Sequence, residues 1–365
     1  MKNKKRFGTR KEYVVAALVL AAAFGTMGRV APWRAKAVKK VKAVVPVVTE
    51  APKFRRAIDG MFVEKGKENP PLAGVMQENM IEAQPISGIA DANLVFEAVT
   101  EANITRFLAY YTLDEAHVVP EIGPVRSARP YYLDWASEFN TLYGHVGSAP
   151  AAYALLRGKG VAGVQDLDQW YQSQYFERVN YRAAPHNVYT SAARLRKAYE
   201  KLVVSSQPPV VSQWHFKNDA SLDLRGNVNE ITVAYVAPYG VGWHYDKQQN
   251  QYTRMQWGTL SVPNAHAERG GGPHKDASGK IIMAKNIAVA FEDMKVLDEV
   301  GRKQFTTIGE GNGLVFQDGR VVVGTWKKPS ALERMRWYDG QGNEVEFNAG
   351  VTWIEIVPKG YEVKY

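Results

Sequence analysis

The turn at residues 122–130, Ile-Gly-Pro-Val-Arg-Ser-Ala-Arg-Pro, constrains the fold of this chain more than any other segment. Its glycine and two prolines interrupt any strand or helix that would run through it. Pro130 suits the first turn of a helix, because its ring fixes φ and its missing N–H is not needed there. The next residues, 131–140, carry apolar side chains at helical spacing. The sequence therefore predicts a helix at 131–140, directly preceded by two arginines and a serine.

Further strands and helices are predicted on both sides of this turn. Within residues 69–205, apolar runs bounded by polar residues predict strands, and helical spacing next to capping residues predicts helices. The strands are 72–76, 93–99, 104–112 and 141–146, and the helices besides 131–140 are 151–156 and a segment from Thr190 or Ser191 to about Leu202. This alternation is typical of an α/β domain, in which ligands bind where strands end and helices begin.

The pattern changes after residues 205–209, Ser-Ser-Gln-Pro-Pro. Short apolar runs now alternate with Gly, Asn and Asp turns, and Asp318-Gly319 and Asp339-Gly340 indicate hairpins. The predicted strands are 232–236, 252–256, 281–283, 286–292, 314–316, 321–325, 335–338 and 351–357. The predicted fold class is therefore α+β. An N-terminal α/β domain with strand-turn-helix units (69–205) precedes a β-rich C-terminal domain (210–360).

Residues 1–28 have the pattern of an export signal or membrane anchor. A basic segment at 1–11 precedes the almost purely apolar segment 13–24. Both a cleaved and an uncleaved form fit, because small residues allow processing but more basic residues follow. Residues 29–68 are a basic Ala/Val/Lys/Pro linker, either solvated or resting on an anionic surface. We expect the body on the extracytoplasmic side of a membrane, or secreted if the signal is cleaved.

Charge and cysteine content exclude several classes of function. Residues 1–50 contain 12 Lys and Arg against 2 Asp and Glu, so the other residues contain 34 basic and 35 acidic side chains. A body that is nearly neutral lacks the charge pattern of a nucleic-acid-binding protein, and we expect no nucleic-acid partner. The chain has no cysteine, which excludes disulfides, thiolate zinc sites, cysteine nucleophiles and a lipid-attachment cysteine.

The turn at 122–130 is the first candidate site. Guanidinium groups beside a helix N-terminus offer charge-assisted hydrogen bonds to a phosphate or carboxylate. The alternative is that Arg126 and Arg129 pair with internal acids such as Asp91, Glu97 or Glu101. Ser127 lacks the Gly-x-Ser-x-Gly surroundings of a hydrolase nucleophile.

Two further segments could contribute to the same site. His145 and Ser148 lie near a strand end, and His186 and Asn187 lie in a turn that precedes a helix; a structural histidine and ordinary turn chemistry are the alternatives. The candidate ligand-binding residues are Glu97, Arg106, Arg126, Ser127, Arg129, His145, Ser148, His186 and Asn187. No catalytic residue is assigned.

No metal or cofactor is expected. His266, His274 and Asp276 do not have a recognised ligand spacing. The glycine-rich segment 309–313 lacks the Lys-Ser/Thr that follows a phosphate-binding loop.

Several segments together resemble the YerB-like family of bacterial lipoproteins. They are 91–97 (Asp-Ala-Asn-Leu-Val-Phe-Glu), 104–108, 123–130, 145–150, 184–187, 284–286, 313–319, 324–328 and 350–354. The resemblance implies an outward-facing protein attached to a bacterial membrane, with an α/β domain followed by a β-rich domain, and no established activity. Without a cysteine, the N-terminal segment rather than a lipid would provide the anchor.

Two functions remain open. The first is an envelope protein of unknown activity that binds an anionic ligand or an envelope protein partner at the Arg126–Arg129 turn. The alternative is an envelope hydrolase or phosphotransferase that acts on a phosphorylated cell-wall or lipid-linked substrate. Convergence of the candidate residues on one open pocket would support a binding site.

Overall fold

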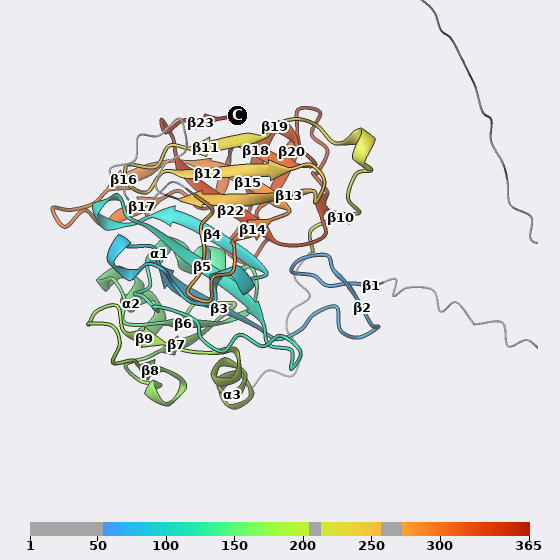
Figure 1. The fold of residues 1–365 in the computed structure, drawn as a ribbon. Coiled ribbons are helices and arrows are strands. Elements are labelled where there is room, and N and C mark those ends of the chain that lie inside the picture. Colours follow the sequence, from blue (N-terminus) through green and yellow to red (C-terminus); the bar gives the residue numbers. More distant parts are fainter. Residues whose placement is uncertain (1–53, 204–212, 257–271) are drawn as a thin grey trace, which may run out of the picture. The chain divides into compact units, whose positions relative to one another are not determined.

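The computed structural model describes residues 54–203, 213–256 and 272–365 (Figure 1). The expected signal or anchor, most of the linker and His266 lie outside these residues. The described residues belong to one compact unit, Glu50–Tyr365. None of the helices in them is long and apolar enough to cross a membrane.

The helices begin where their local sequence signals predict. They are α1 (Pro130–Ser137), α2 (Pro150–Arg157) and α3 (Ala192–Leu202). Proline occupies the first turn of both α1 and α2, and the Ser191 side chain caps α3 by accepting a hydrogen bond from the backbone N–H of Arg194. Helix α1 ends three residues before its predicted end, and Asn140 adopts a left-handed conformation (φ 46°) before the next strand begins.

A mixed ten-stranded sheet forms the centre of the fold. Its order is β20-β19-β18-β15-β22-β4-β5-β3-β6-β7. The strands are β20 (Arg336–Asp339), β19 (Arg320–Lys328), β18 (Gly309–Gln317), β15 (Asn286–Glu292), β22 (Thr352–Pro358), β4 (Leu94–Val99), β5 (Thr105–Thr112), β3 (Leu72–Glu78), β6 (Thr141–His145) and β7 (Val164–Asp168).

This sheet contains strands from both predicted domains. β22 pairs in parallel with β4 on one side and with β15 on the other. The α+β class is confirmed, with helices concentrated in the first part and strands in the second (Figure 1). The division at residues 205–210 stays a prediction, and the shared sheet that joins the two parts was not foreseen.

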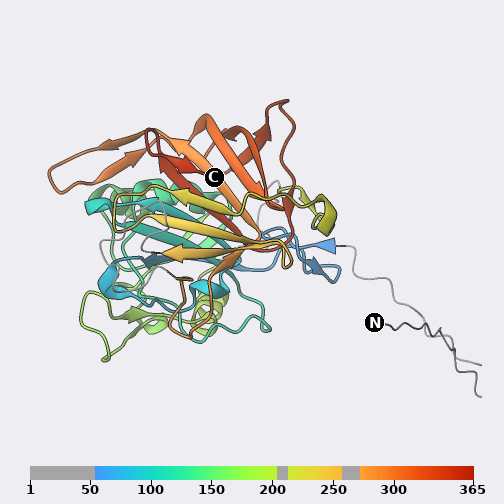
Figure 2. The same ribbon diagram turned by 45° about the horizontal axis from the view of Figure 1, so that its top comes forward.

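A second, five-stranded sheet has the order β14-β13-β12-β11-β23. Its strands are β14 (Met283–Ala284), β13 (Gln251–Gln256), β12 (Val241–Asp246), β11 (Glu230–Val233) and β23 (Val363–Lys364). The two-stranded pairs are β1 (Phe54–Arg55) with β2 (Phe62–Val63), β8 (Glu177–Arg178) with β9 (Val188–Tyr189), β10 (Phe216–Lys217) with β21 (Phe347–Asn348), and β16 (Met294–Val296) with β17 (Lys303–Phe305). The orange β16–β17 hairpin projects from the body in Figure 2.

The central sheet has a core on each face. On one face, Phe96 of β4 stacks on Trp135 of α1, with ring centroids 5.7 Å apart. On the other face, Trp353 of β22 packs edge-on against Trp243 of β12 at 5.3 Å. These four side chains are fully or almost fully buried. Helix α1 therefore covers one face of the central strands, and the five-stranded sheet covers the other.

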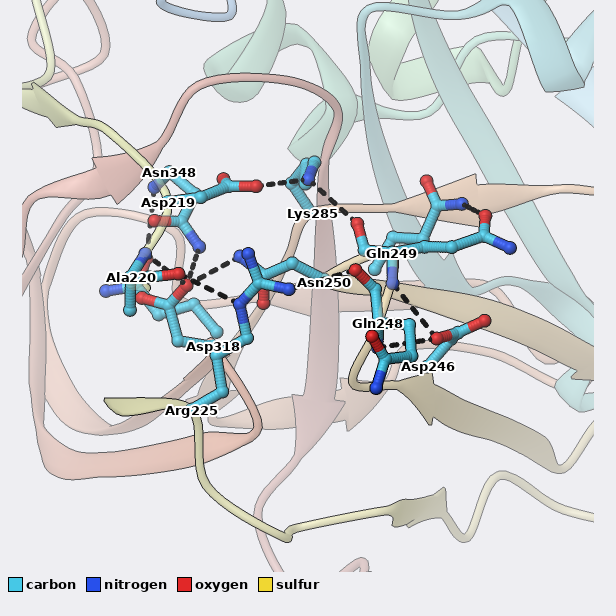
Figure 3. Close-up of polar contacts among 12 residues, drawn as sticks. Asp219, Ala220, Arg225, Asp246, Gln248, Gln249, Asn250, Lys285, Asp318 and Asn348 are labelled. Carbon is cyan, nitrogen blue, oxygen red and sulfur yellow. Dashed lines mark hydrogen bonds and ion pairs between the residues drawn. The ribbon is translucent and has the colours of Figure 1, made fainter. Parts of the chain in front are cut away.

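Asp318, in the β18–β19 hairpin, connects several turns at one end of the molecule (Figure 3). Asp318 and Gly319 are left-handed (φ 53° and 64°), as the Asp-Gly signal for a tight hairpin predicts. The Asp318 carboxylate accepts hydrogen bonds from Asn250 (2.7 Å), Asn348 (2.8 Å) and the Ala220 N–H (3.2 Å). Lys217 pairs with it as well.

Burial alone would raise the pKa of Asp318, but its hydrogen bonds with Lys217, Asn250 and Asn348 outweigh this effect and lower it. The charged form is therefore the form that holds the turns together. Lys285 bridges the same region, since its ammonium contacts Asp219 at 2.6 Å and the Gln249 carbonyl at 3.3 Å (Figure 3).

We expect Asp318→Asn to lower the free energy of unfolding by about 2 kcal/mol. The NH₂ group of asparagine cannot accept the hydrogen bonds that the carboxylate now accepts, and the ion pair with Lys217 is lost. Asparagine keeps the size of the side chain and tolerates the left-handed backbone. Asp339→Asn, in the solvent-exposed second hairpin, is the control and should lower stability clearly less, because water can replace the contacts of its carboxylate. Urea unfolding of both variants measures the difference, and equal losses would contradict the role given to Asp318.

Candidate functional site

The candidate site lies at one edge of the ten-stranded sheet. β3, β4, β6 and β7 run in the same direction, so their carboxyl ends meet at this edge. The 122–130 turn crosses there: the Arg126 N–H donates to the Met76 carbonyl (2.8 Å), and the Val146 N–H donates to the Arg126 carbonyl (3.1 Å). Carboxyl ends of parallel strands are where open α/β sheets bind ligands.

A cavity of about 170 Å³ opens at this edge. It lies between the end of β3, the start of β5, the turn after β4 and the 122–130 turn. Its lining residues are Glu78, Asn79, Met80, Thr100, Glu101, Ala102, Ile104, Thr105, Arg106, Arg126 and Arg129. Three of the nine candidate residues, all of them arginines, therefore face one cavity.

Arg129 forms a two-pronged ion pair with Glu101 in the turn after β4. Its Nε and Nη2 donate to the two carboxylate oxygens, each at 2.7 Å. Burial would raise the pKa of Glu101, but hydrogen bonding to Arg129 and the charge of Arg129 outweigh it and lower that pKa. The pairing of Arg129 with an internal acid was one of the two sequence-based alternatives, and it coexists with the cavity.

Arg126 pairs with Glu78 at the end of β3, with 3.2 Å between Nε and Oε1. The same carboxylate contacts Nδ1 of His186 at 2.8 Å. The backbone carbonyl of Pro185 also accepts a hydrogen bond from Arg126 at 3.2 Å. The turn at 184–187 thus lies next to Arg126, although His186 does not line the cavity and its role in binding stays a prediction.

Arg106 of β5 differs from the other two arginines because no carboxylate compensates it. The residue is 7% exposed, and its one hydrogen bond in the described part of the chain runs from Nη1 to the Ser127 carbonyl at 2.8 Å. Burial, then the charges of Arg129 and Arg126, lower the pKa of Arg106 to about 10. The guanidinium still carries its charge at neutral pH, so the cavity has a positive charge without a matching negative one.

Lys303 of β17 adds a further positive charge close to this edge. The residue is 6% exposed, and burial lowers the pKa of its amine although the nearby Glu101 carboxylate partly opposes this. The same hairpin packs beside the cavity, where Gly301 approaches the backbone N of Ala102. The second part of the chain therefore contributes to the electrostatics of a site built mostly by the first.

Other candidate residues have structural partners. His145 lies 2.7 Å from Asp166 through Nε2 and 2.8 Å from the Gly147 carbonyl through Nδ1. Asn187 accepts a hydrogen bond from Arg178 (3.1 Å). These two residues do not line the cavity, and their role in binding stays a prediction.

The two serines of the candidate set also lie beside the cavity rather than in its lining. Ser127 uses its backbone carbonyl to hold Arg106 and Arg129. The Ser148 hydroxyl is buried and has no hydrogen-bond partner among the described residues. Ser148 and Ala128 form a β-bridge, so this hydroxyl lies next to the arginine turn.

Glu97 lies away from the cavity, in the core between the two sheets. Both of its carboxylate oxygens accept hydrogen bonds from Nη2 of Arg254 at 2.9 Å, and one also accepts the Trp353 indole N–H at 3.0 Å. Glu97 and Arg254 are fully buried. We therefore leave Glu97 out of the proposed site, because its charge is already used in the core.

Glu355 lies next to Glu97 in the parallel β22–β4 register. It accepts hydrogen bonds from Trp243 and Tyr235, each at 3.0 Å. Burial, then the neighbouring Glu97 charge, raise the pKa of Glu355 to about 8. Arg254 thus balances the charge of Glu97, and the neighbouring carboxyl group of Glu355 is protonated at neutral pH.

His274 contacts Arg254 through Nδ1 at 2.7 Å, and burial with that positive charge holds its pKa well below the usual value. Asp276 accepts hydrogen bonds from the backbone N–H groups of Ser278 and Lys280. In the part of the chain that the structure describes, no cluster of His, Asp and Glu side chains is placed to hold a metal ion.

Sequence reasoning missed Glu78 and Lys303. Glu78 is the last residue of β3, and a charged residue at the end of an apolar strand was a usable signal for the strand-end edge. Lys303 is separated from Arg129 by more than half of the described chain, and no local pattern connects them.

Comparisons with known proteins agree with the fold. Residues 60–205 match the family described as "Protein of unknown function (DUF3048) N-terminal domain", and residues 231–354 match its C-terminal domain. The chain is 30% identical over 274 residues to the protein named "Putative lipoprotein YerB" of Bacillus subtilis (strain 168), covering 73% of this chain and 74% of that protein. The chain therefore belongs to this YerB-like family, as its sequence motifs indicated.

The crystal structure of YerB from Bacillus subtilis has a similar fold. The TM-score is 0.69 at 26% sequence identity, and the match covers 86% of this chain and 100% of the YerB chain. Both domains belong to a family of unknown function, and the geometry of the cavity is the evidence for what this chain binds.

The buried carboxyl group of Glu355 predicts a specific pH dependence of stability. Its pKa in the folded state, about 8, exceeds the ordinary value of 4.5. Its contribution to stability is therefore complete below pH 4.5 and is lost as the pH rises towards 8. Below pH 6.5, His274 opposes this trend, because burial lowers its pKa and the unfolded chain binds its proton more readily.

The difference in unfolding free energy between wild type and Glu355→Gln isolates the effect of Glu355. We expect the variant to gain about 3–4 kcal/mol relative to wild type between pH 5 and pH 8. Glu310→Gln changes a surface carboxylate that pairs with Lys327 and should give no such trend. A pH-independent difference for Glu355→Gln would show that this carboxyl group is not protonated in the fold.

Proposed function

We propose that this protein is a bacterial envelope protein that binds an anionic ligand in the cavity between Arg106, Arg126 and Arg129. The observation that carries the proposal is the uncompensated guanidinium of Arg106, which is 7% exposed and lines the cavity. Burying a charge without a partner is costly, and a buried charge that also lines a cavity is a candidate ligand contact.

The geometry of the other two arginines supports the same proposal. Arg129 and Arg126 are held by Glu101 and Glu78, so their positions are set before a ligand arrives. Three guanidinium groups against two carboxylates leave one net positive charge in the lining. A phosphate or carboxylate group would complete the charge balance and accept the donors of Arg106 that have no acceptor in the described part of the chain.

The envelope location rests on two observations. The basic segment 1–11 and the apolar segment 13–24 have the order of an export signal or anchor. The relative from Bacillus subtilis carries the name of a lipoprotein, which fits a protein attached to the outer face of the cell membrane. Without a cysteine, this chain would be attached through residues 1–28.

Binding is the better supported of the two functions. A hydrolase or phosphotransferase needs a base close to its nucleophile. Among the described residues, neither His145 nor His186 forms a hydrogen bond with the Ser127 hydroxyl; their contacts are with Asp166, the Gly147 carbonyl and Glu78. The enzyme alternative therefore receives no specific support from the contacts at the cavity.

Substituting Arg106 tests the proposal, because ligand binding and folding should respond in opposite ways. Arg106→Met removes the charge and keeps most of the apolar stem. We expect inorganic phosphate to bind the variant at least about tenfold more weakly, since a charge-assisted hydrogen bond contributes about 1.5–3 kcal/mol. The unfolding temperature without ligand should stay the same or rise, because an unpaired buried charge is removed.

Arg334→Met is the matched control. Arg334 is 4% exposed, and burial lowers its pKa to about 10 as well, but it lies over the Phe139 ring, away from the cavity. Calorimetry on the full chain in detergent should give unchanged phosphate binding for this variant. No binding of phosphate to wild type, or equal binding by Arg106→Met, would refute the proposed anion site.

A further inference from the structure

The cavity is too small to hold more than the anionic group of a ligand. Its volume is about 170 Å³, whereas pockets that enclose a whole small molecule measure roughly 300–1,000 Å³. The rest of any larger ligand must therefore lie on the surface outside the cavity. The side chains on that surface indicate its chemistry.

An exposed aromatic platform lies at the same sheet edge, after the carboxyl end of β7. It consists of Tyr153, Trp170 and Tyr171, which are 42%, 67% and 56% exposed. The two tyrosine hydroxyls are hydrogen-bonded at 2.6 Å. The Arg157 guanidinium lies 3.8 Å from the Tyr171 ring centroid and is itself held by Asp168. The two tyrosine rings are thus exposed but held in place, which lowers the entropy lost when a ligand packs against them.

The platform adjoins the arginine turn through the backbone. A Cβ at position 147 would lie 3.0 Å from Nε1 of Trp170, so the indole rests against Gly147. The Gly147 carbonyl accepts the Ala128 N–H at 3.1 Å. Ala128 lies between the two arginines of the 122–130 turn and directly precedes Arg129. The buried, unpartnered hydroxyl of Ser148 lies on this same connection.

A second connection runs through polar side chains. Gln169, next to Trp170, accepts a hydrogen bond from Arg178 at 3.1 Å, and Arg178 donates another to Asn187 at 3.1 Å. Asn187 follows His186, which contacts Glu78 in the lining of the cavity. A strip of amide and guanidinium groups therefore links the platform to the anion site.

We propose that the ligand is an anionic saccharide, whose phosphate or carboxylate group enters the arginine cavity and whose sugar ring stacks on Trp170. This inference rests on the proposed anion site. The apolar face of a sugar ring packs on an aromatic side chain, while its hydroxyl groups exchange hydrogen bonds with amide and guanidinium groups. The strip through Gln169, Arg178 and Asn187 offers these groups beside the platform.

Calorimetry with four probes tests the inference on the full chain in detergent: inorganic phosphate, glycerol 3-phosphate, glucose 1-phosphate and methyl glucoside. Glucose 1-phosphate should bind about tenfold more tightly than inorganic phosphate or glycerol 3-phosphate, the order expected for one ring stacked on an aromatic side chain. Methyl glucoside, which has the ring but no charge, should bind more weakly than glucose 1-phosphate.

Trp170→Ala should abolish the advantage of glucose 1-phosphate and leave the affinity for inorganic phosphate unchanged. Tyr365→Ala removes another exposed aromatic side chain (56% exposed) beyond β23 and should change neither affinity. Both substitutions are at exposed positions, so folding should be preserved, and the unfolding temperature of each variant checks this.

The outcomes separate the two proposals. Equal affinities for the three phosphate compounds, or an unchanged advantage of glucose 1-phosphate in Trp170→Ala, would overturn the saccharide inference and leave the anion site standing. A fifth probe, phosphotyrosine, tests the alternative occupant: tighter binding of phosphotyrosine than of glucose 1-phosphate would assign the platform to an aromatic ligand and also overturn the saccharide inference. Failure of all three phosphate compounds to bind would overturn both proposals.

Discussion

The buried ion pair between Glu97 and Arg254 is the interaction on which the arrangement of the two sheets depends. Both side chains are fully buried, and removing two charges from water is costly unless each has a partner in good geometry. Glu97 belongs to β4 and Arg254 to β13, so the pair can form only if the five-stranded sheet lies over the central strands. The indole of Trp353 on β22 donates a further hydrogen bond to Glu97, so the position of a third strand depends on the same buried carboxylate.

The position of the candidate site follows from this arrangement. β4 is fixed between β22 and β5, and the turn that leaves its carboxyl end carries Glu101 to the arginine turn. The balance between positive and negative side chains differs between the core and the cavity. In the core, Arg254 is balanced by Glu97, and burial keeps Glu355 protonated. At the cavity, Arg106 stays charged without a carboxylate of its own, so a positive charge is left unbalanced where a ligand can reach it.

The sequence predicted those features of the fold that depend on neighbouring residues. Pro130 begins a helix, Ser191 caps one, and Asp318-Gly319 closes a hairpin, because each effect acts within a few residues. The paths of the strands were also largely predictable. β7 and β12 were not predicted, although in β12 Val241, Trp243 and Tyr245 alternate with Gly242, His244 and Asp246, a usable strand signal.

Long-range pairing could not be predicted in the same way. The residues next to Glu97 in sequence do not show whether its carboxylate points towards Arg254 or towards the arginine turn. Successive side chains of a strand point to opposite faces of the sheet, and the local pattern does not identify what lies on each face. The partner of Arg126 proved to be Glu78 and not one of the acids first considered. For Arg129 and Glu101, 28 residues apart, the expected kind of pairing was found.

The position of β22 in the sheet has a consequence for how this protein is made. Trp353 and Glu97, which contact each other across adjacent strands, are 256 residues apart in sequence. A ribosome delivers β4 long before β22, so one edge of β4 lacks its neighbour until almost the whole chain has been synthesised. Unpaired edges invite association with other chains, and contacts of long sequence separation form slowly. This edge of β4 therefore stays unpaired during synthesis, and the loss of even a short C-terminal segment that includes β22 would leave the centre of the sheet open.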